Sequence, residues 1–236
     1  MALPKVNTPT YELILPSTGQ RVAYRPYLVK EEKIIMLAAE SNDEKQMVRA
    51  VKDVIASCTN GEVDTNRITM FDLEYLFTQL RAKSVGESSD IKVKCSECGK
   101  SNDATVNLAD ITVDVPKGAY KGTVKKITED ISVLLRYPIV DTILESSQGK
   151  SEVDTAFDLV ASCIDTIYQG DEAFDVSEAS RDEVIEFVES LSTQQFQNIY
   201  EFVDTMPSAS LDVRFKCSHC GHDNDITVKG LVNFFS

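Results

Sequence analysis

Apolar residues recur three and four positions apart in two segments of the chain, residues 69–80 and 192–203. This spacing places an apolar stripe along one face of a helix, so both segments are predicted to be amphipathic helices. Each segment also opens with a hydroxyl side chain followed three positions later by a residue that completes a helix cap. The stripes are Leu73, Leu76, Phe77 and Leu80, and Phe196, Ile199, Tyr200 and Val203; the caps are Thr69 with Asp72 and Ser192 with Gln195.

Apolar and polar residues alternate on both sides of a Cys-x-x-Cys-Gly stretch in two further segments, "IKVKCSECGKSNDATV" at 91–106 and "VRFKCSHCGHDNDITV" at 213–228. Alternation with a period of two predicts short strands, and the Cys-x-x-Cys-Gly stretch inside each segment predicts a tight turn. Each segment is therefore predicted to be a β-hairpin with two thiols at its tip. The residues that recur at an offset of 122 positions are Lys94, Cys95, Ser96, Cys98, Gly99, Asn102, Asp103, Thr105 and Val106, repeated from Lys216 to Val228.

The correspondence between the two parts of the chain extends upstream of the hairpins. One pair of segments predicts a strand, then Arg and Pro, then a helix, because proline ends a strand and fits the first turn of a helix. A second pair predicts two helix ends that each close at a glycine. These pairs are 22–37 with 133–144, and 51–62 with 160–171, closing at Gly61 and Gly170.

These matches indicate an internal duplication with pseudo-twofold symmetry. The first lobe is expected at residues 1–109 and the second at 110–236, with the two lobes packed as one unit. The second lobe carries extra residues, in which Ser180 and Glu183 predict an additional capped helix.

The cysteine spacing predicts a zinc site. Zinc prefers four soft ligands in a closed tetrahedron when its role is structural. One Cys-x-x-Cys turn supplies two thiolates, so Cys95, Cys98, Cys217 and Cys220 together complete one four-thiolate site. The predicted fold is α+β, with duplicated lobes of short antiparallel strands and helices. Two zinc-knuckle hairpins join them in a zinc-ribbon-like site that holds structural Zn²⁺.

Other arrangements of these cysteines remain open. Each turn could be completed locally, with His219 and His222 serving the second turn, although Glu97 and Lys100 stand at those positions in the first. Four thiolates also suit an iron–sulfur cluster. A redox-active pair is disfavoured, because such pairs usually begin a helix next to a βαβ unit. The remaining cysteines, Cys58 and Cys163, are expected to be small buried apolar residues.

Composition narrows the possible functions. The chain has 236 residues, of which 42% are hydrophobic and 26% are charged, as expected for a soluble globular protein. No apolar run suggests a secretory leader or a membrane span, so we expect a cytosolic protein whose thiols stay reduced. A net charge of −14 disfavours nucleic acid as a partner, because the phosphate backbone is itself negative.

No catalytic pattern is present in the sequence. It has neither a phosphate-binding glycine loop nor a nucleophile elbow, and its only two histidines, His219 and His222, both lie in the second thiol motif. We therefore expect no enzymatic activity and no small-molecule substrate. The C-terminal "LVNFFS" at 231–236 is expected either to pack on its own domain or to serve as an apolar plug for a partner.

The opening "LPKVNTPTYELILPSTGQRVAYRPYLVKEEKIIMLAAES", followed by paired Cys-x-x-Cys-Gly motifs, resembles the baseplate hub subunits and hub assembly proteins of T4-type contractile-tailed bacteriophages. The resemblance covers most of the chain. It implies a non-enzymatic hub component or assembly factor whose partners are other baseplate, hub or tail proteins. It also implies location in the host cytoplasm during assembly, and in the tail baseplate of the virion if the protein is retained.

Two rival functions remain at this point. Lys92, Lys94, Arg214 and Lys216 beside the thiol turns would suit a zinc-ribbon adaptor for nucleic acid or transcription machinery, although solvent-facing strand positions also explain them. A metal-dependent enzyme is disfavoured, because four cysteine ligands leave no open coordination position.

Overall fold

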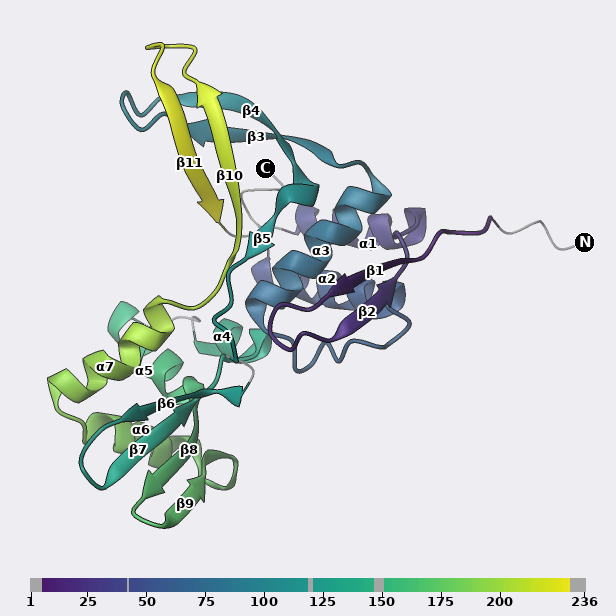
Figure 1. The fold of residues 1–236 in the computed structure, drawn as a ribbon. Coiled ribbons are helices and arrows are strands. Elements are labelled where there is room, and N and C mark those ends of the chain that lie inside the picture. Colours follow the sequence, from purple (N-terminus) through teal and green to yellow (C-terminus); the bar gives the residue numbers. More distant parts are fainter. Residues whose placement is uncertain (1–5, 42, 119–120, 147–150, 230–236) are drawn as a thin grey trace, which may run out of the picture. The chain divides into compact units, whose positions relative to one another are not determined.

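The computed structural model describes residues 6–41, 43–118, 121–146 and 151–229 (Figure 1). The described chain is mixed α+β, with seven α-helices and short strands that all pair antiparallel. Its internal contacts divide it into two compact units. Unit 1 comprises residues 1–114 and 208–236, and unit 2 comprises residues 115–207.

These units differ from the lobes expected from the repeat, 1–109 and 110–236. The last segment of the chain packs with the first unit instead of with residues 110–207. The reason is that its strands share an apolar core with the first hairpin and pair with a short strand that precedes unit 2. The boundary expected from the recurring motifs therefore differs from the boundary between the compact units.

Unit 1 contains helices and hairpins from both ends of the sequence. In chain order its elements are β1 (Tyr11–Ile14), β2 (Arg21–Tyr24), α1 (Val29–Glu40), α2 (Glu44–Cys58), α3 (Met70–Ser84), β3 (Ser88–Lys94), β4 (Ser101–Asn107), the 3₁₀ turn η1 (Leu108–Asp110), β5 (Thr112–Val113), β10 (Ala209–Lys216) and β11 (Asp223–Lys229). The sheets have the orders β1-β2, β3-β4 and β11-β10-β5.

Helix α3 forms where the apolar stripe predicts a helix. The Thr69 side chain accepts a hydrogen bond from the Asp72 N–H and so caps its first turn. The stripe residues are all buried, which confirms the predicted core face. They are Leu73, Leu76, Phe77 and Leu80.

Both predicted hairpins are present, and they lie side by side in Figure 1. Strand β3 pairs with β4 from Ser88↔Asn107 to Lys94↔Ser101, and β10 pairs with β11 from Ser210↔Lys229 to Lys216↔Asp223. One face of each hairpin contributes to a shared apolar core because alternate side chains of a strand point to the same side. The buried members are Ala82, Ile91, Val93, Ala104, Val106, Leu108, Ile111, Ala209, Leu211 and Val213.

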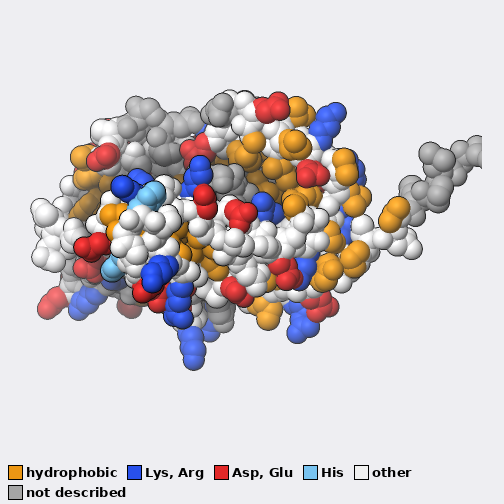
Figure 2. All heavy atoms as spheres, turned by 90° about the horizontal axis from the view of Figure 1, so that it is seen from above, with side chains coloured by type: hydrophobic (Ala, Val, Ile, Leu, Met, Phe, Trp, Pro, Cys, Tyr) orange, Lys and Arg blue, Asp and Glu red, His pale blue; other side chains and the backbone are white. Residues whose placement is uncertain are grey.

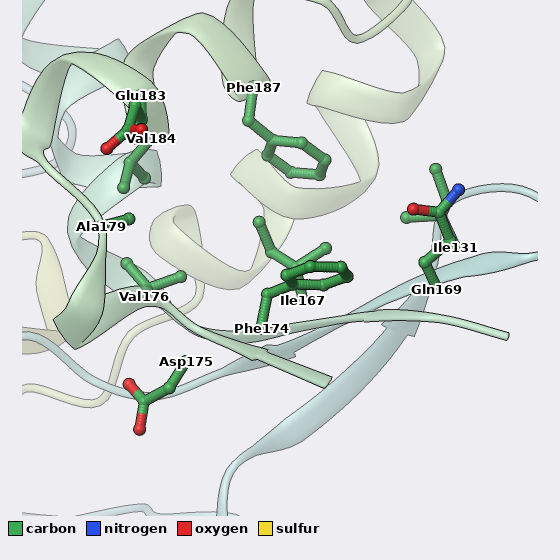
Figure 3. A pocket seen from close by; sticks show the side chains of 10 residues that line it. All are labelled: Ile131, Ile167, Gln169, Phe174, Asp175, Val176, Ala179, Glu183, Val184 and Phe187. Carbon is green, nitrogen blue, oxygen red and sulfur yellow. The ribbon is translucent and has the colours of Figure 1, made fainter. Parts of the chain in front are cut away.

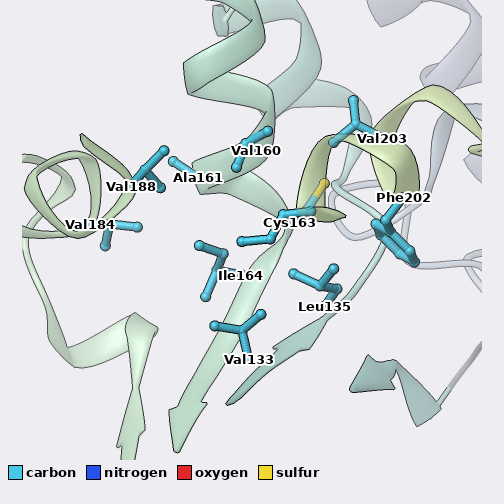
Figure 4. Close-up of a cluster of buried hydrophobic side chains, with 11 residues drawn as sticks. Val133, Leu135, Val160, Ala161, Cys163, Ile164, Val184, Val188, Phe202 and Val203 are labelled. Atoms are coloured by element: carbon cyan, nitrogen blue, oxygen red, sulfur yellow. The ribbon is translucent and has the colours of Figure 1, made fainter. Parts of the chain in front are cut away.

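Unit 2 is built from one continuous stretch of chain. Its elements are β6 (Thr123–Lys126), β7 (Ile131–Leu135), α4 (Val140–Ser146), α5 (Glu152–Cys163), β8 (Ile164–Gln169), β9 (Glu172–Asp175), the 3₁₀ turn η3 (Val176–Glu178), α6 (Arg181–Glu189) and α7 (Thr193–Asp204). A four-stranded sheet, β6-β7-β8-β9, packs against α5, α6 and α7 around the apolar cluster of Figure 4.

Two of the helices in unit 2 confirm predicted caps. Ser180 begins α6 and Ser192 begins α7, each in a capping box with Glu183 and Gln195 respectively. In both cases the hydroxyl accepts a backbone N–H while the third residue's side chain accepts the cap residue's N–H.

The prediction that a helix ends at Gly170 is wrong. Helix α5 ends at Cys163, and β8 begins at the next residue. Residues 164–169 are rich in β-branched and aromatic side chains, and they pair antiparallel with β7, with one irregularity in register between Leu134 and Leu135. Gly170, with φ 57°, lies in the tight turn between β8 and β9.

The prediction about residues 231–236 lies outside the described part of the chain. None of the helices among the described residues combines the length and the apolarity needed to cross a membrane.

Candidate metal centre

Four thiols from two hairpin turns converge within unit 1. Cys95 and Cys98 belong to the β3–β4 turn, whereas Cys217 and Cys220 belong to the β10–β11 turn. The four sulfur atoms all lie within 4.8 Å of one another, and Cys95–Cys220 and Cys98–Cys217 are each separated by 3.7 Å. Sulfurs bound tetrahedrally to Zn²⁺ at about 2.3 Å would be about 3.8 Å apart. The cluster therefore has the dimensions of a tetrahedral thiolate site.

Backbone hydrogen bonds give the two turns the same shape. In the first turn the Cys95 N–H donates to the Lys100 carbonyl over 3.0 Å, and the Gly99 N–H donates to the Cys95 carbonyl over 2.9 Å. The second turn has the corresponding bonds Cys217 N–H to His222 carbonyl, 2.8 Å, and Gly221 N–H to Cys217 carbonyl, 2.9 Å. Both glycines have a positive φ, 70° and 76°, a conformation that costs an L side chain energy.

A buried asparagine from each hairpin reaches into the turn of the other. Asn102 accepts hydrogen bonds through Oδ1 from the Ser218 N–H and hydroxyl, over 2.8 and 2.9 Å. Its Nδ2 lies 3.6 Å from the Cys217 sulfur. The same contacts recur from the other side between Asn224 and Ser96 N–H, 2.9 Å, Ser96 hydroxyl, 2.9 Å, and Cys95 Sγ, 3.6 Å. The two amides therefore fix the position of one turn against the other.

Hydrogen-bond donors around the two buried cysteines of the cluster, Cys95 and Cys217, favour the thiolate form. The Cys98 N–H lowers the pKa of Cys95, and the Glu97 N–H adds to this effect against the opposing effect of desolvation. Desolvation would raise the pKa of Cys217, but the N–H groups of Cys220 and His219 outweigh it and lower that pKa to about 5. The thiols of Cys95 and Cys217 therefore favour the charged form that a metal requires.

The pKa of the exposed thiol Cys220 is shifted in the opposite direction. The N–H of His222 favours its thiolate, but desolvation and the neighbouring sulfurs of Cys217, Cys98 and Cys95 raise its pKa to about 12. Like charges packed this closely disfavour one another. A divalent cation at the centre would remove that penalty, which is why a soft cation is the ligand that this donor set suits.

The structure places the histidines beside the thiol cluster. His219 and His222 are exposed, and the Nε2 of His219 lies 3.3 Å from the Ser101 carbonyl oxygen. The four sulfurs are one group, since no pair is separated from the others. This grouping favours a shared site over the arrangement in which each turn is completed locally.

Asn102 and Asn224 are the residues that the sequence reasoning missed. Both are recurring positions, four residues after the second cysteine of each motif, and the sequence pattern assigns them no role. Their type was the available signal, because a buried amide must satisfy its donors and acceptor. The amides do so mainly across the two hairpins, which spacing alone does not specify.

The other two cysteines are buried apart from this cluster, as predicted. Burial raises the pKa of Cys58 to about 11 and that of Cys163 to about 12, so both remain neutral thiols near neutral pH.

Three of the four basic residues beside the turns lie opposite acidic residues in the ladders, whereas Lys94 lies opposite Ser101. Lys92 faces Asp103 and Lys216 faces Asp223, while Arg214 donates to Asp225 over 3.0 Å. These acidic neighbours offset the positive charge that a nucleic-acid surface would need.

Unit 2 contains an open cavity of about 340 Å³ between the sheet and α6 (Figure 3). Phe174, Ile167 and Phe187 form much of its lining, and Glu183 lies at one side. The Glu183 carboxylate already accepts the Ser180 N–H in the cap of α6. The lining therefore offers an apolar surface but no pairing of a nucleophile with a base.

Comparison with known proteins places these features in a family. Residues 8–236 match the family model described as T4 bacteriophage base plate protein. The chain is 25% identical over 206 residues to "Baseplate hub assembly protein gp26" of Enterobacteria phage T4, covering 87% of this chain and 88% of that protein. No solved structure matches the chain.

Proposed function

This chain belongs to the T4 bacteriophage base plate protein family, and we propose that it is a non-enzymatic structural or assembly protein of a baseplate hub. The similarity to a protein named for hub assembly supports this role. We expect its partners to be other hub, baseplate or tail proteins. Assembly would take place in the host cytoplasm, and the protein would remain in the tail baseplate if it is retained in the virion.

We further propose that Cys95, Cys98, Cys217 and Cys220 hold one structural Zn²⁺ in a zinc-ribbon-like site. The observation that carries this proposal is the convergence of four sulfurs from turns 122 positions apart. Bound zinc would supply a charge-neutralising link between the two turns and no open coordination position. Its free energy of binding would add to the free energy of folding.

The two hairpins would be equivalent products of an internal duplication. Matching backbone bonds outside the thiol site support this interpretation. The Arg25 N–H donates to the Cys58 carbonyl over 3.0 Å, and the Arg136 N–H donates to the Cys163 carbonyl over 2.8 Å. Each arginine follows a strand and each cysteine ends a helix, so the same connection occurs once in each unit.

The metal content of the purified chain tests the shared site. We expect one zinc per chain, and we expect Cys95→Ser and Cys217→Ser to lower that content to the same degree. Cys163→Ser is the matched control, because it removes a buried thiol in unit 2. Full metal retention by one of the two turn variants, with loss from the other, would show that the sites are separate.

Reconstitution of the hub tests the biological role. Hub proteins assembled with and without this chain should differ in yield, and a tail protein should co-purify with it. Unchanged assembly with no co-purifying tail protein would contradict the role. A steep loss of DNA affinity with rising salt would instead support the nucleic-acid adaptor.

A further inference from the structure

Helix α1 of unit 1 exposes an unusual share of the apolar surface. Five of the eleven large hydrophobic residues that are exposed in the described chain lie within residues 28–37. The helix buries Glu31 and Ala38 on one side, while Val29, Met36 and Leu37 are 80%, 60% and 57% exposed. Figure 2 shows one face of the molecule, on which hydrophobic side chains reach the surface among acidic and basic ones. Such a concentration on one helix is typical of an interaction site.

Two charges interrupt the exposed side of α1 in a regular way. We name Val29, Lys33, Met36, Leu37 and Glu40 the α1 ridge, because helical geometry places them on the side opposite the buried Glu31 and Ala38. Lys33 and Glu40 are seven residues apart, so about 10 Å of helix separates them and they cannot form an ion pair with each other. Among the described residues neither of them forms an ion pair with any other group.

This pattern is self-complementary. Lys33 and Glu40 lie at equal distances on either side of the midpoint between Met36 and Leu37. If a second copy of α1 packs antiparallel about a twofold axis at that midpoint, Lys33 faces the partner's Glu40 and Glu40 faces the partner's Lys33. Met36 then lies against the partner's Leu37. A twofold interface requires a patch that complements itself in this way.

We propose that the α1 ridge is a homodimer interface, in which two copies of this chain pair their α1 helices antiparallel. This inference goes beyond the proposed function and does not depend on zinc. A second copy fits better than an unrelated acidic or basic partner, because each ridge already carries one charge of each sign at matching positions. One pair of 12-residue helices makes a small contact area, so the association is expected to be weak, with Kd on the order of micromolar.

A charge-swap experiment tests the antiparallel pairing. Sedimentation of the full zinc-loaded chain over a range of concentrations should show a monomer–dimer equilibrium. Lys33→Glu alone and Glu40→Lys alone should each weaken dimerisation about tenfold or more, since each creates two like-charge contacts across the axis. The Lys33→Glu/Glu40→Lys double variant should return to within about threefold of the wild type, because both pairs form again with reversed sign.

An apolar substitution provides an independent measurement. Met36→Asp should abolish dimerisation, whereas the matched control Val153→Asp, at an exposed valine of α5 in unit 2, should leave it unchanged. Zinc content and helicity should equal those of the wild type in every variant, so a folding defect is distinguishable from a lost interface. The proposal is overturned if the wild type stays monomeric at all concentrations. It is also overturned if the double variant is as weak as the single variants, or if Met36→Asp behaves like Val153→Asp.

Discussion

Unit 1 and unit 2 reach a stable fold by different routes. Unit 2 is one continuous stretch, and its core combines sheet and helix side chains with stacked aromatic pairs, Tyr137–Phe202 and Phe157–Phe196. Unit 1 joins the two ends of the sequence, and its hairpin core combines aliphatic side chains from both hairpins, such as Ile91, Val106 and Leu211. Bringing distant segments together costs loop-closure entropy.

The thiol cluster lies between the two segments whose association carries this entropic cost. It connects the β3–β4 turn to the β10–β11 turn, with all of unit 2 between them in the sequence. We expect the continuous unit to be stabilised by apolar burial alone, and the discontinuous unit to gain additional stability from the metal link proposed above. The predictions below separate these two sources of stability, beginning with the largest expected effect.

Removal of metal should affect unit 1 far more than unit 2. Chelation of a zinc-loaded chain is expected to lower the stability of the hairpin pair by at least about 5 kcal/mol, because structural zinc contributes directly to folding. Hydrogen exchange would report this loss as rapid exchange of amides in β3, β4, β10 and β11. Amides of β7 and β8 should keep their protection. Equal deprotection of both units would show that the chain folds as one cooperative body and that the contrast is wrong.

A substitution that leaves a cavity in the core of unit 2 should destabilise unit 2 and leave the thiol site of unit 1 intact. Leu135 is fully buried, so Leu135→Ala should lower the free energy of unfolding of unit 2 by about 4 kcal/mol. Zinc content should not change. The control Val124→Ala, at an exposed position of β6, should shift that free energy by less than about 0.5 kcal/mol. Loss of zinc in the Leu135 variant would mean that the thiol site depends on unit 2.

A buried ion pair should make unit 1 sensitive to acid independently of the thiols. Burial would raise the pKa of Glu31, but hydrogen bonds from Arg25, the Leu28 N–H, Lys30 and Ser57 outweigh it and lower the pKa from 4.5 to about 2. A depressed pKa stabilises the folded state above about pH 4.5, and this contribution is lost as the pH falls from 4.5 towards 2. Its size is about 3 kcal/mol.

Comparing the wild type with Glu31→Gln isolates the contribution of the Glu31 carboxylate to the free energy of unfolding. The variant should be about 3 kcal/mol less stable at pH 7, and the difference should shrink as the pH falls through 4.5. Urea unfolding of both proteins at each pH measures this difference in the free energy of unfolding. Any loss of metal in acid affects both proteins equally, because they carry the same thiols. A difference that stays constant down to pH 3 would contradict the depressed pKa.

The smallest predicted effect concerns the reciprocal amides. Asn102→Ala and Asn224→Ala should each weaken zinc affinity by about tenfold and to a similar extent, because each removes the same contacts from opposite hairpins. Competition with a zinc-binding dye measures the affinity. Asn198→Ala is the control, since this asparagine donates to the Lys126 carbonyl within unit 2. Unequal effects of the two variants would argue against equivalent hairpins.

Much of the local structure could be predicted from short-range patterns. The stripe from Leu73 to Leu80 and the cap at Thr69 predicted α3, and alternation around Cys95 and Cys217 predicted both hairpins. The failure at 164–169 has a physical reason. A helix end followed directly by a strand has no intervening turn residue, and only the pairing with β7 distinguishes the two conformations.

The sequence by itself predicted α3, α6, α7, both hairpins and the four thiols that the structure brings together, because periodicity, caps and cysteine spacing act over a few residues. The tertiary structure alone decided three further features: the assignment of residues 208–236 to unit 1, which sulfurs of opposite turns approach to 3.7 Å, and the crossing of Asn102 and Asn224. Each of these depends on contacts between segments more than 90 residues apart. Such contacts form only when apolar faces of separate hairpins are buried against each other, and no local pattern encodes which faces meet.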